Sequence, residues 1–258
     1  NLQLEPIELV TYPHDLVGGI KIDEYGRTNV PGLYDAGEAA GGSHGASRFG
    51  GSALSDCLVF GAASGEDAAD FSRKLGDHLP LTHADVSQVK EKVSDWLSRD
   101  GLDPAEALNQ TRKIAFVHLN MVRSERGLRE ALAVSGQLRS DMLVGLSARG
   151  DSDKERGNKL RHAIEAEGQA QLAALIATAA LERRESRGGF FGGHYRTEYP
   201  NRDDRNWLKN IVLSKSNDAI KVAHEPPVEL SGVSKQARDV MATAWKAPDD
   251  PEHWSEAE

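Results

Sequence analysis

The sequence lacks the residues and patterns on which several protein classes depend. It has a single cysteine, Cys57, so it can form no internal disulfide framework and no CxxC motif for a metal or an iron–sulfur cluster. No apolar run approaches the roughly 20 residues of a membrane-spanning helix. The nine histidines are scattered without the spacing of metal ligands, and no Gly-Lys-Ser/Thr phosphate-binding loop occurs. We therefore predict no metal site, no direct membrane span and a reducing compartment.

Positive charge is also in short supply. The 31 lysines and arginines stand against 40 aspartates and glutamates, which gives a formal net charge of −9 and a pI of about 5.5. Nucleic acids and anionic membrane surfaces bind clustered cations, so neither is expected as a direct partner. With 39% hydrophobic and 28% charged residues, the composition is that of an ordinary soluble protein that can build one or two domains.

What the sequence does contain is a glycine-rich segment from Gly32 to Gly61, GLYDAGEAAGGSHGASRFGGSALSDCLVFG. Glycine is used this densely where the backbone approaches a ligand closely or takes positive φ. The segment carries Glu38, His44 and Arg48 and runs into a helix whose start would present free N–H groups to the same place. We interpret it as a ligand-binding loop, because a linker would not contain its apolar residues.

Two further blocks accompany this segment: residues 14–20, HDLVGGI, and residues 185–208, which begin ESRG and end NWL. Together the three blocks resemble the succinate dehydrogenase/fumarate reductase flavoprotein family, whose patterns read GLYAAGE then HGANRLGGNSL, HYxMGGI, and ESRGxHYRxDYPxRDDxNWL. The HDLVGGI block precedes the glycine-rich segment, as the corresponding patterns do in the family, and the two are separated by about the same number of residues. In the third block, about five residues around Phe190 and Phe191 look inserted.

The resemblance implies an FAD-dependent oxidoreductase that interconverts succinate and fumarate by hydride transfer at the flavin. Such a reaction needs cations that fix both carboxylates of the substrate against the flavin. Arg48 suits this task because its planar fork grips a carboxylate bidentately and stays charged, and His14 can supply a hydrogen bond or a charge. At these two motif positions the family binds its dicarboxylate, so we predict substrate binding at His14 and Arg48. No residue of this chain is predicted with certainty to be catalytic.

The same resemblance implies cofactor contacts. The glutamate that matches Glu38 contacts the ribityl or ribose region of FAD, and the pair that matches Ala53 and Leu54 addresses the isoalloxazine through backbone N–H groups at a helix start. For His44 we favour a partly buried, structural role over flavin contact. The family's aromatic and methionine after its histidine are replaced here by other residues, and the acid Asp15 would favour a protonated His14 if the two approach each other.

Other family features are missing or undecided. The GxGxxG turn that holds the FAD pyrophosphate is absent, so we expect this sequence to be the C-terminal part of a longer flavoprotein, inactive alone and completed by the missing N-terminal part. The resemblance implies that an iron–sulfur subunit is the partner and that the location is cytoplasmic, with peripheral membrane attachment through partner subunits as a further option. Two alternatives stay open: an L-aspartate oxidase, and a docking module for the iron–sulfur subunit.

The predicted fold class is α+β and predominantly helical. We expect the distal part of an FAD-binding α/β domain over residues 1–76, a helical bundle over 77–187, and a loop, β-hairpin and tail over 188–258. Apolar periodicity and capping signals predict the individual elements. In the first region they are a short buried strand over Leu33–Ala36 and a helix from Gly51 to Arg73 with Cys57 on its buried face. The bundle consists of helices around Val86–Leu97, from Asp103 to Met121, over Leu128–Met142 and over Leu160–Leu181. The last region contains a hairpin of Trp207–Leu213 with Ala219–Val222 and a short helix over Ser234–Trp245. We assign Arg187, His194, Tyr195 and Arg196 to contacts between domains beneath the cofactor.

Overall fold

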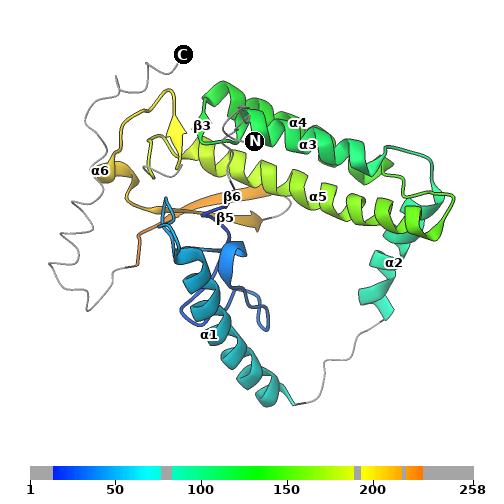
Figure 1. Ribbon diagram of the computed structural model, residues 1–258, viewed down its shortest axis with the longest axis horizontal. Helices are drawn as coiled ribbons and strands as arrows, with labels where there is room; N and C mark the ends of the chain where they lie inside the picture. Colours follow the sequence, from blue (N-terminus) through cyan, green and yellow to red (C-terminus); the bar gives the residue numbers. More distant parts are fainter. Residues whose placement is uncertain (1–13, 77–82, 189–192, 217–218, 229–258) are drawn as a thin grey trace, which may run out of the picture.

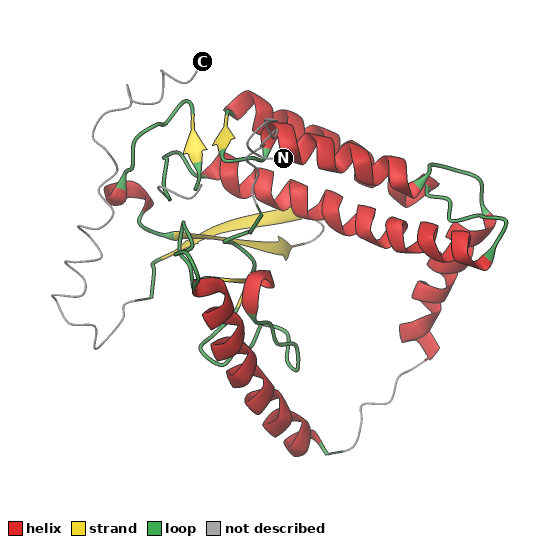
Figure 2. Ribbon diagram, in the orientation of Figure 1, coloured by secondary structure: helices red, strands yellow, loops and turns green. Residues whose placement is uncertain are grey.

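The computed structural model describes residues 14–76, 83–188, 193–216 and 219–228 of the 258. Helices dominate these residues, and the strands form short pairs and one hairpin (Figure 2). The predicted class, helix-rich α+β, is confirmed. The predicted helix over Ser234–Trp245 and the inserted residues around Phe190 and Phe191 lie outside the described residues.

Three long helices form the bundle: α3 (Pro104–His118), α4 (Glu125–Gly145) and α5 (Asp153–Glu182), with α2 (His83–Ser98) at one end of α5 (Figure 1). Each of the three begins at a capping side chain. The carboxylate of Asp103 accepts the Ala105 N–H at 2.8 Å, and Pro104 follows at the first helical position, where it needs no N–H partner. The hydroxyls of Ser124 and Ser152 cap α4 and α5 in the same way. These starts are dictated by local sequence.

The core of the bundle is built on small residues of α5. Its buried face consists of alanines alone, which let α3 and α4 pack closely against it: Ala163, Ala166, Ala170, Ala173, Ala174, Ala177 and Ala180. Larger apolar residues from the other helices fill the layer, among them Leu108, Leu128, Leu138 and Met142, all at most 5% exposed. By contrast, Ile164 and Leu172 of α5 are 58% and 44% exposed. The helix periodicity was therefore predicted correctly, whereas its buried face is the alanine face.

The N-terminal segment is organised around α1 (Ser52–Leu75). A parallel pair, β1 (Ile20–Lys21) with β2 (Ala40–Gly41), and the 3-10 helix η1 (Gly37–Ala39) lie beside its first half. The predicted strand Leu33–Ala36 is reduced to one antiparallel bridge, Tyr34 with Arg27. Two backbone hydrogen bonds flank it, from Thr28 N to Leu33 O and from Asp35 N to Gly26 O, so the pairing is too short to form a strand. Cys57 is exposed rather than buried, since much of the apolar surface of α1 is uncovered in this structure.

The C-terminal part connects these two regions. Strand β3 (Val122–Arg123) pairs in parallel with β4 (Tyr195–Arg196), and the single-turn helix α6 (Asp204–Trp207) leads into the hairpin. The hairpin itself is antiparallel, β5 (Asn210–Ser216) with β6 (Ala219–Glu225), in the predicted place. Glu225 of β6 forms an ion pair with Lys21 of β1, with Oε2 2.6 Å from Nζ. His224 of the same strand lies with Nε2 3.0 Å from Oε1 of Glu182, at the end of α5. The hairpin thus lies between the bundle and the N-terminal segment (Figure 1).

Candidate functional site

The two predicted substrate-binding residues lie in contact. Arg48 Nη2 is 3.0 Å from His14 Nε2, although the residues are 34 positions apart. Arginine can only donate, so His14 Nε2 accepts this hydrogen bond and the ring proton lies on Nδ1. Asp15 Oδ2 lies 3.2 Å from Arg48 Nε, with the side chains of Arg48 and Asp15 only 22% and 14% exposed. The acid next to His14 therefore pairs with the arginine and not with the histidine.

Close backbone contact brings the two motif blocks together. At Gly19 a Cβ would lie 2.1 Å from the Ala39 carbonyl oxygen, and at Gly41 it would lie 2.6 Å from the Gly19 nitrogen. Any side chain at either position would push β1 and β2 apart. The GG pair after His14 and the glycines before Arg48 therefore serve the same contact between strands.

Glu38 reinforces this contact. Its Oε1 accepts the Leu16 N–H at 3.1 Å, across 22 residues, and so ties the backbone next to His14 and Asp15 to the glycine-rich segment. The side chain is otherwise exposed. Sequence reasoning predicted Glu38 as a cofactor ligand, and this contact with the other motif block is one that it missed.

Ala53 and Leu54 occupy the first turn of α1, as predicted. The helix starts after Gly51, which has φ 84°, and no side chain caps its N-terminal N–H groups. Leu54 and the preceding Phe49 are 70% and 68% exposed. An uncapped helix start beside exposed apolar side chains suits a ligand with an apolar body and hydrogen-bond acceptors at its rim.

Unpaired buried atoms test whether the expected flavin fits here. Within the described residues, Asp35 Oδ2, Ser47 Oγ and Arg99 Nε are buried without a hydrogen-bond partner; Asp35 precedes Glu38 by three residues and Ser47 directly precedes Arg48. Buried polar atoms are normally paired, so Asp35 and Ser47 have hydrogen-bonding capacity that the described residues leave unused. A Cβ at Gly42, Gly45, Gly50 or Gly51 would meet nothing within 4 Å, which leaves open space along the loop. A flavin bound along this loop would meet the backbone N–H groups of Ala53 and Leu54 with its isoalloxazine, and Glu38 would lie toward its ribityl or ribose region.

His44 lies behind this loop. Its Nε2 is 3.9 Å from Asp56 Oδ2 of α1, and the two side chains are 14% and 5% exposed. This is the partly buried environment that the sequence predicts for His44. The two side chains thus face each other between the loop and the helix that follows it.

The end of the bundle touches the same loop through Gly188. This glycine has φ +86°, and a Cβ there would lie 2.2 Å from the carbonyl oxygen of Ala46, two residues before Arg48. Just before it, the fully buried Glu185 is paired with Arg183 and Arg187 at 2.6 Å each and accepts the Asp203 N–H at 2.8 Å. Sequence reasoning missed the role of Glu185. The signal available was an acid placed between arginines in the run RRESR.

The predicted contact residues of this block divide into two groups. Arg196 is 1% exposed and donates to the Ala180 carbonyl at 2.6 Å, so it satisfies the C-terminal end of α5. His194 Nδ1 accepts from Arg123 Nη1 at 2.7 Å. Burial, and next the charge of Arg123, lower the pKa of His194 to about 3, so its imidazole is neutral at physiological pH. Tyr195, in contrast, is 43% exposed.

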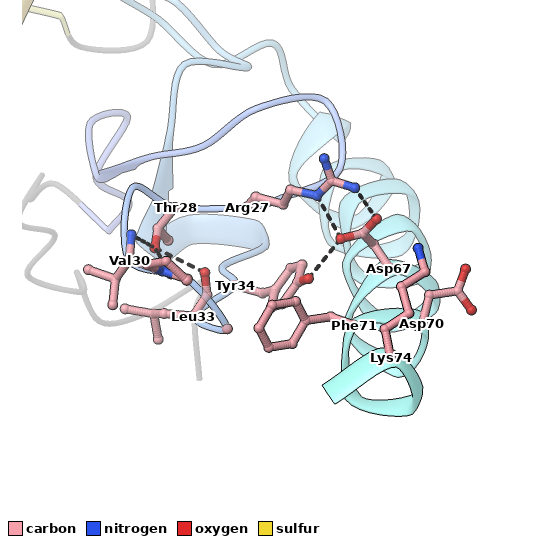
Figure 3. A pocket seen from close by; sticks show the side chains of 11 residues that line it. Arg27, Thr28, Val30, Leu33, Tyr34, Asp67, Asp70, Phe71 and Lys74 are labelled. Carbon is pink, nitrogen blue, oxygen red and sulfur yellow. Dashed lines mark hydrogen bonds and ion pairs between the residues drawn. The ribbon is translucent and has the colours of Figure 1, made fainter. Parts of the chain in front are cut away.

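A cleft of about 260 Å³ lies away from Arg48, near the C-terminal half of α1 (Figure 3). Arg27 grips the carboxylate of Asp67 with Nε at 2.7 Å and with Nη2, and the Tyr34 hydroxyl donates to the same carboxylate at 2.7 Å. Hydrogen bonds from Arg27 and then from Tyr34 lower the pKa of Asp67 to about 2. The cleft contains none of the predicted site residues, and its charged groups join the Asp23–Arg27 turn to α1.

Neither a metal cluster nor a membrane span occurs in the part of the chain that the structure describes. Within those ranges, no group of three or more His, Cys, Asp or Glu side chains is placed to hold a metal ion. Among the same residues, no helix has both the length and the apolar character needed to cross a membrane.

Known proteins match this chain over most of its length. It is 32% identical over 219 residues to a subunit of the fumarate reductase (CoM/CoB) of Methanothermobacter marburgensis, and the match covers 83% of this chain and 38% of the relative. It is 31% identical over 228 residues to the L-aspartate oxidase of Pseudomonas aeruginosa, covering 87% of this chain and 36% of that protein. The structure of the Mycobacterium smegmatis Sdh1 complex in the apo form superposes with a TM-score of 0.74 at 25% identity, over 95% of this chain and 41% of that chain. The chain therefore spans well under half the length of these relatives.

Family models match both parts of the sequence. The model described as FAD binding domain matches residues 5–54, which contain His14, Glu38 and Arg48. The model described as fumarate reductase flavoprotein C-term matches residues 109–240, half of the sequence. The chain thus belongs to the FAD-dependent flavoproteins of the succinate dehydrogenase and fumarate reductase family, of which it carries the C-terminal domain and part of the FAD-binding domain.

Proposed function

We propose that this chain supplies the carboxylate-binding part of a flavin site that interconverts succinate and fumarate. The observation that carries the proposal is the 3.0 Å contact between Arg48 Nη2, in the glycine-rich segment, and His14 Nε2. The flavin supplies the hydride donor or acceptor when it is bound. The residues of this chain bind and orient the substrate carbons.

The donors of the pair support this role. Arg48 Nη1 has no partner among the described residues, and the His14 ring keeps an N–H on Nδ1 once Nε2 accepts from Arg48. The exposed His14 and the partly buried Arg48 can therefore present donors to one carboxylate. Since a dicarboxylate has two such groups, the second carboxylate needs donors from outside this pair.

The test is Arg48→Ala in the intact, flavin-loaded protein. Losing a charge-assisted contact to a carboxylate, about 3–4 kcal/mol, should lower kcat/KM for succinate or fumarate by about 100- to 1000-fold. The visible flavin spectrum should persist, because Arg48 is not among the proposed flavin contacts. Arg149→Ala is the matched control, since among the described residues its side chain pairs with the exposed Asp100, in the connections between the helices of the bundle. Unchanged kinetics in the Arg48 variant would refute the assignment.

L-Aspartate oxidation is the second candidate, because an L-aspartate oxidase is 31% identical to this chain. An amino dicarboxylate presents the same carboxylates to Arg48 and His14. The two candidates separate when the oxidised, flavin-loaded protein is mixed with succinate or with L-aspartate and bleaching of the flavin is followed. Bleaching by L-aspartate alone would favour the second candidate.

We also propose, on the family resemblance, that the partner is an iron–sulfur electron-transfer subunit and that the location is cytoplasmic. The helical bundle, with exposed apolar residues such as Phe116 and Val117, is the proposed docking side. Purification of the intact protein from its native source tests this, because a bound iron–sulfur subunit would co-elute and absorb near the flavin bands. Elution of the flavoprotein by itself would contradict the docking proposal.

A further inference from the structure

The ion pair between Asp15 and Arg48 occupies a position where this sequence departs from the family pattern. In HDLVGGI an acid stands in place of the aromatic residue of HYxMGGI, and its Oδ2 lies 3.2 Å from Arg48 Nε. We infer that Asp15 is a positioning residue that holds the guanidinium of Arg48 in the orientation needed to bind a substrate carboxylate. This inference rests on the proposed function of Arg48.

Two contacts on different nitrogens fix a planar group. Asp15 forms an ion pair with Nε of Arg48, and His14 accepts a hydrogen bond from Nη2. Together these two contacts restrict both the rotation and the tilt of the guanidinium. Nη1 is left without a partner among the described residues and can meet a ligand. Asp15 therefore does not fill the whole fork of Arg48, as a mimic of the substrate carboxylate would.

The loop itself offers Arg48 little support. Gly45 and Gly50 lie close to it on either side, and Cβ atoms at both positions would meet nothing within 4 Å. Its neighbour Phe49 is 68% exposed. A long side chain on such a loop would lose rotamer freedom on binding a ligand, and a partner that orders it beforehand removes that cost. Within the described residues, the partners that can do this are Asp15 and His14.

Asp15 is itself held in place. The next residue, Leu16, donates its N–H to Glu38 Oε1 at 3.1 Å, and the backbones at Gly19 and Gly41 are in direct contact. The side chain of Asp15 is 14% exposed, so its carboxylate is partly shielded from water. Glu38 therefore fixes the backbone of Leu16, which fixes the position of Asp15, and Asp15 in turn holds Arg48.

Charge and position predict opposite effects. A carboxylate near the ligand repels a dianion, so an Asp15 that acted only through its charge would weaken dicarboxylate binding, and its removal would tighten it. A positioning Asp15 strengthens binding through geometry. The variant Asp15→Asn removes the charge and keeps the shape of the side chain, whereas Asp15→Ala removes both.

The experiment measures malonate, a dicarboxylate that does not react, by titration calorimetry with the intact flavin-loaded protein, together with KM and kcat for fumarate. We expect Asp15→Ala to weaken malonate binding and raise KM by ~10-fold or more, the effect of losing the partner of a partly buried ion pair that orders Arg48. Asp15→Asn should fall between the parent protein and Asp15→Ala, because it keeps the side-chain shape beside Nε and loses the charge. If Asp15→Ala fails to retain flavin, Asp15→Ser replaces it, because a serine hydroxyl is too short to reach Nε. The control Asp100→Ala removes an exposed partner of Arg149 and should change nothing.

The outcomes separate this inference from the proposed function. Loss of malonate binding in Arg48→Ala, with parent-like binding in Asp15→Ala, would overturn the positioning role and leave the function of Arg48 standing. Tighter malonate binding in both Asp15 variants would also overturn it. Unchanged binding in Arg48→Ala would instead refute the proposed function, whatever the Asp15 variants do.

Discussion

Acidification from pH 8 to pH 5 should destabilise this chain through His194. The imidazole Nδ1 accepts a hydrogen bond from Arg123 at 2.7 Å, and burial lowers the pKa of His194 from 6.5 to about 3. The unfolded chain binds a proton at this residue below about pH 6.5, while the native state does not. Stability that is fully present above pH 6.5 is therefore lost as the pH falls from 6.5 toward 3.

The size of this loss follows from the two pKa values. Below pH 6.5 the free energy of unfolding falls by about 1.4 kcal/mol per pH unit on account of this one group, which amounts to about 2 kcal/mol by pH 5. The window stops at pH 5 because most carboxylates begin to bind protons below it. His194→Asn removes the titration and keeps an oxygen near the place of Nδ1 that can accept from Arg123.

Urea denaturation followed by far-UV circular dichroism, at pH 8 and at pH 5, measures the effect. The drop in unfolding free energy between the two pH values should be about 2 kcal/mol larger for the parent chain than for His194→Asn. His162→Gln, on α5 and outside this cluster, should behave like the parent chain. Equal drops in the parent chain and in His194→Asn would refute the reasoning, because His194 would then titrate alike in both states.

Three further predictions concern stability. Glu185→Ala should lower the free energy of unfolding by about 3–5 kcal/mol, since it removes the buried carboxylate that two arginines share; a loss below about 1 kcal/mol in urea would contradict this. Gly188→Ala should lower the melting temperature and shift the near-UV spectrum, because its Cβ would meet the Ala46 carbonyl at 2.2 Å; an unchanged melting curve would show that the loop yields freely. Asp103→Ala should cost about 1 kcal/mol through the lost cap to the Ala105 N–H, and Asp103→Ser, another capping residue, should recover most of it.

The helices were predictable because their signals are local. The carboxylate of Asp103, the proline after it and the apolar periodicity act within one or two turns, so they predict a helix wherever the chain goes. Which face of a helix is buried depends on its neighbours. In α5 the close approach of α3 and α4 selects the alanines, and Ile164 is left 58% exposed.

The two wrong predictions share one cause. A strand over Leu33–Ala36 requires a neighbouring strand, and a buried Cys57 requires a surface packed over α1. Within the described residues the first pairing extends over one bridge only, Arg27 with Tyr34, and no surface covers the thiol, which is exposed. An apolar pattern predicts that a segment can be buried, and only the tertiary structure decides whether anything covers it.

By itself the sequence determined the family, the cofactor and the helical class, because motif residues and periodicity are written along the chain. It also singled out His14, Glu38 and Arg48. Only the tertiary structure decided that Asp15 pairs with Arg48, that Glu38 ties down Leu16, and that Arg48 meets His14 across 34 residues. Such contacts join distant segments, and they depend on how the backbones of β1 and β2 approach each other in space.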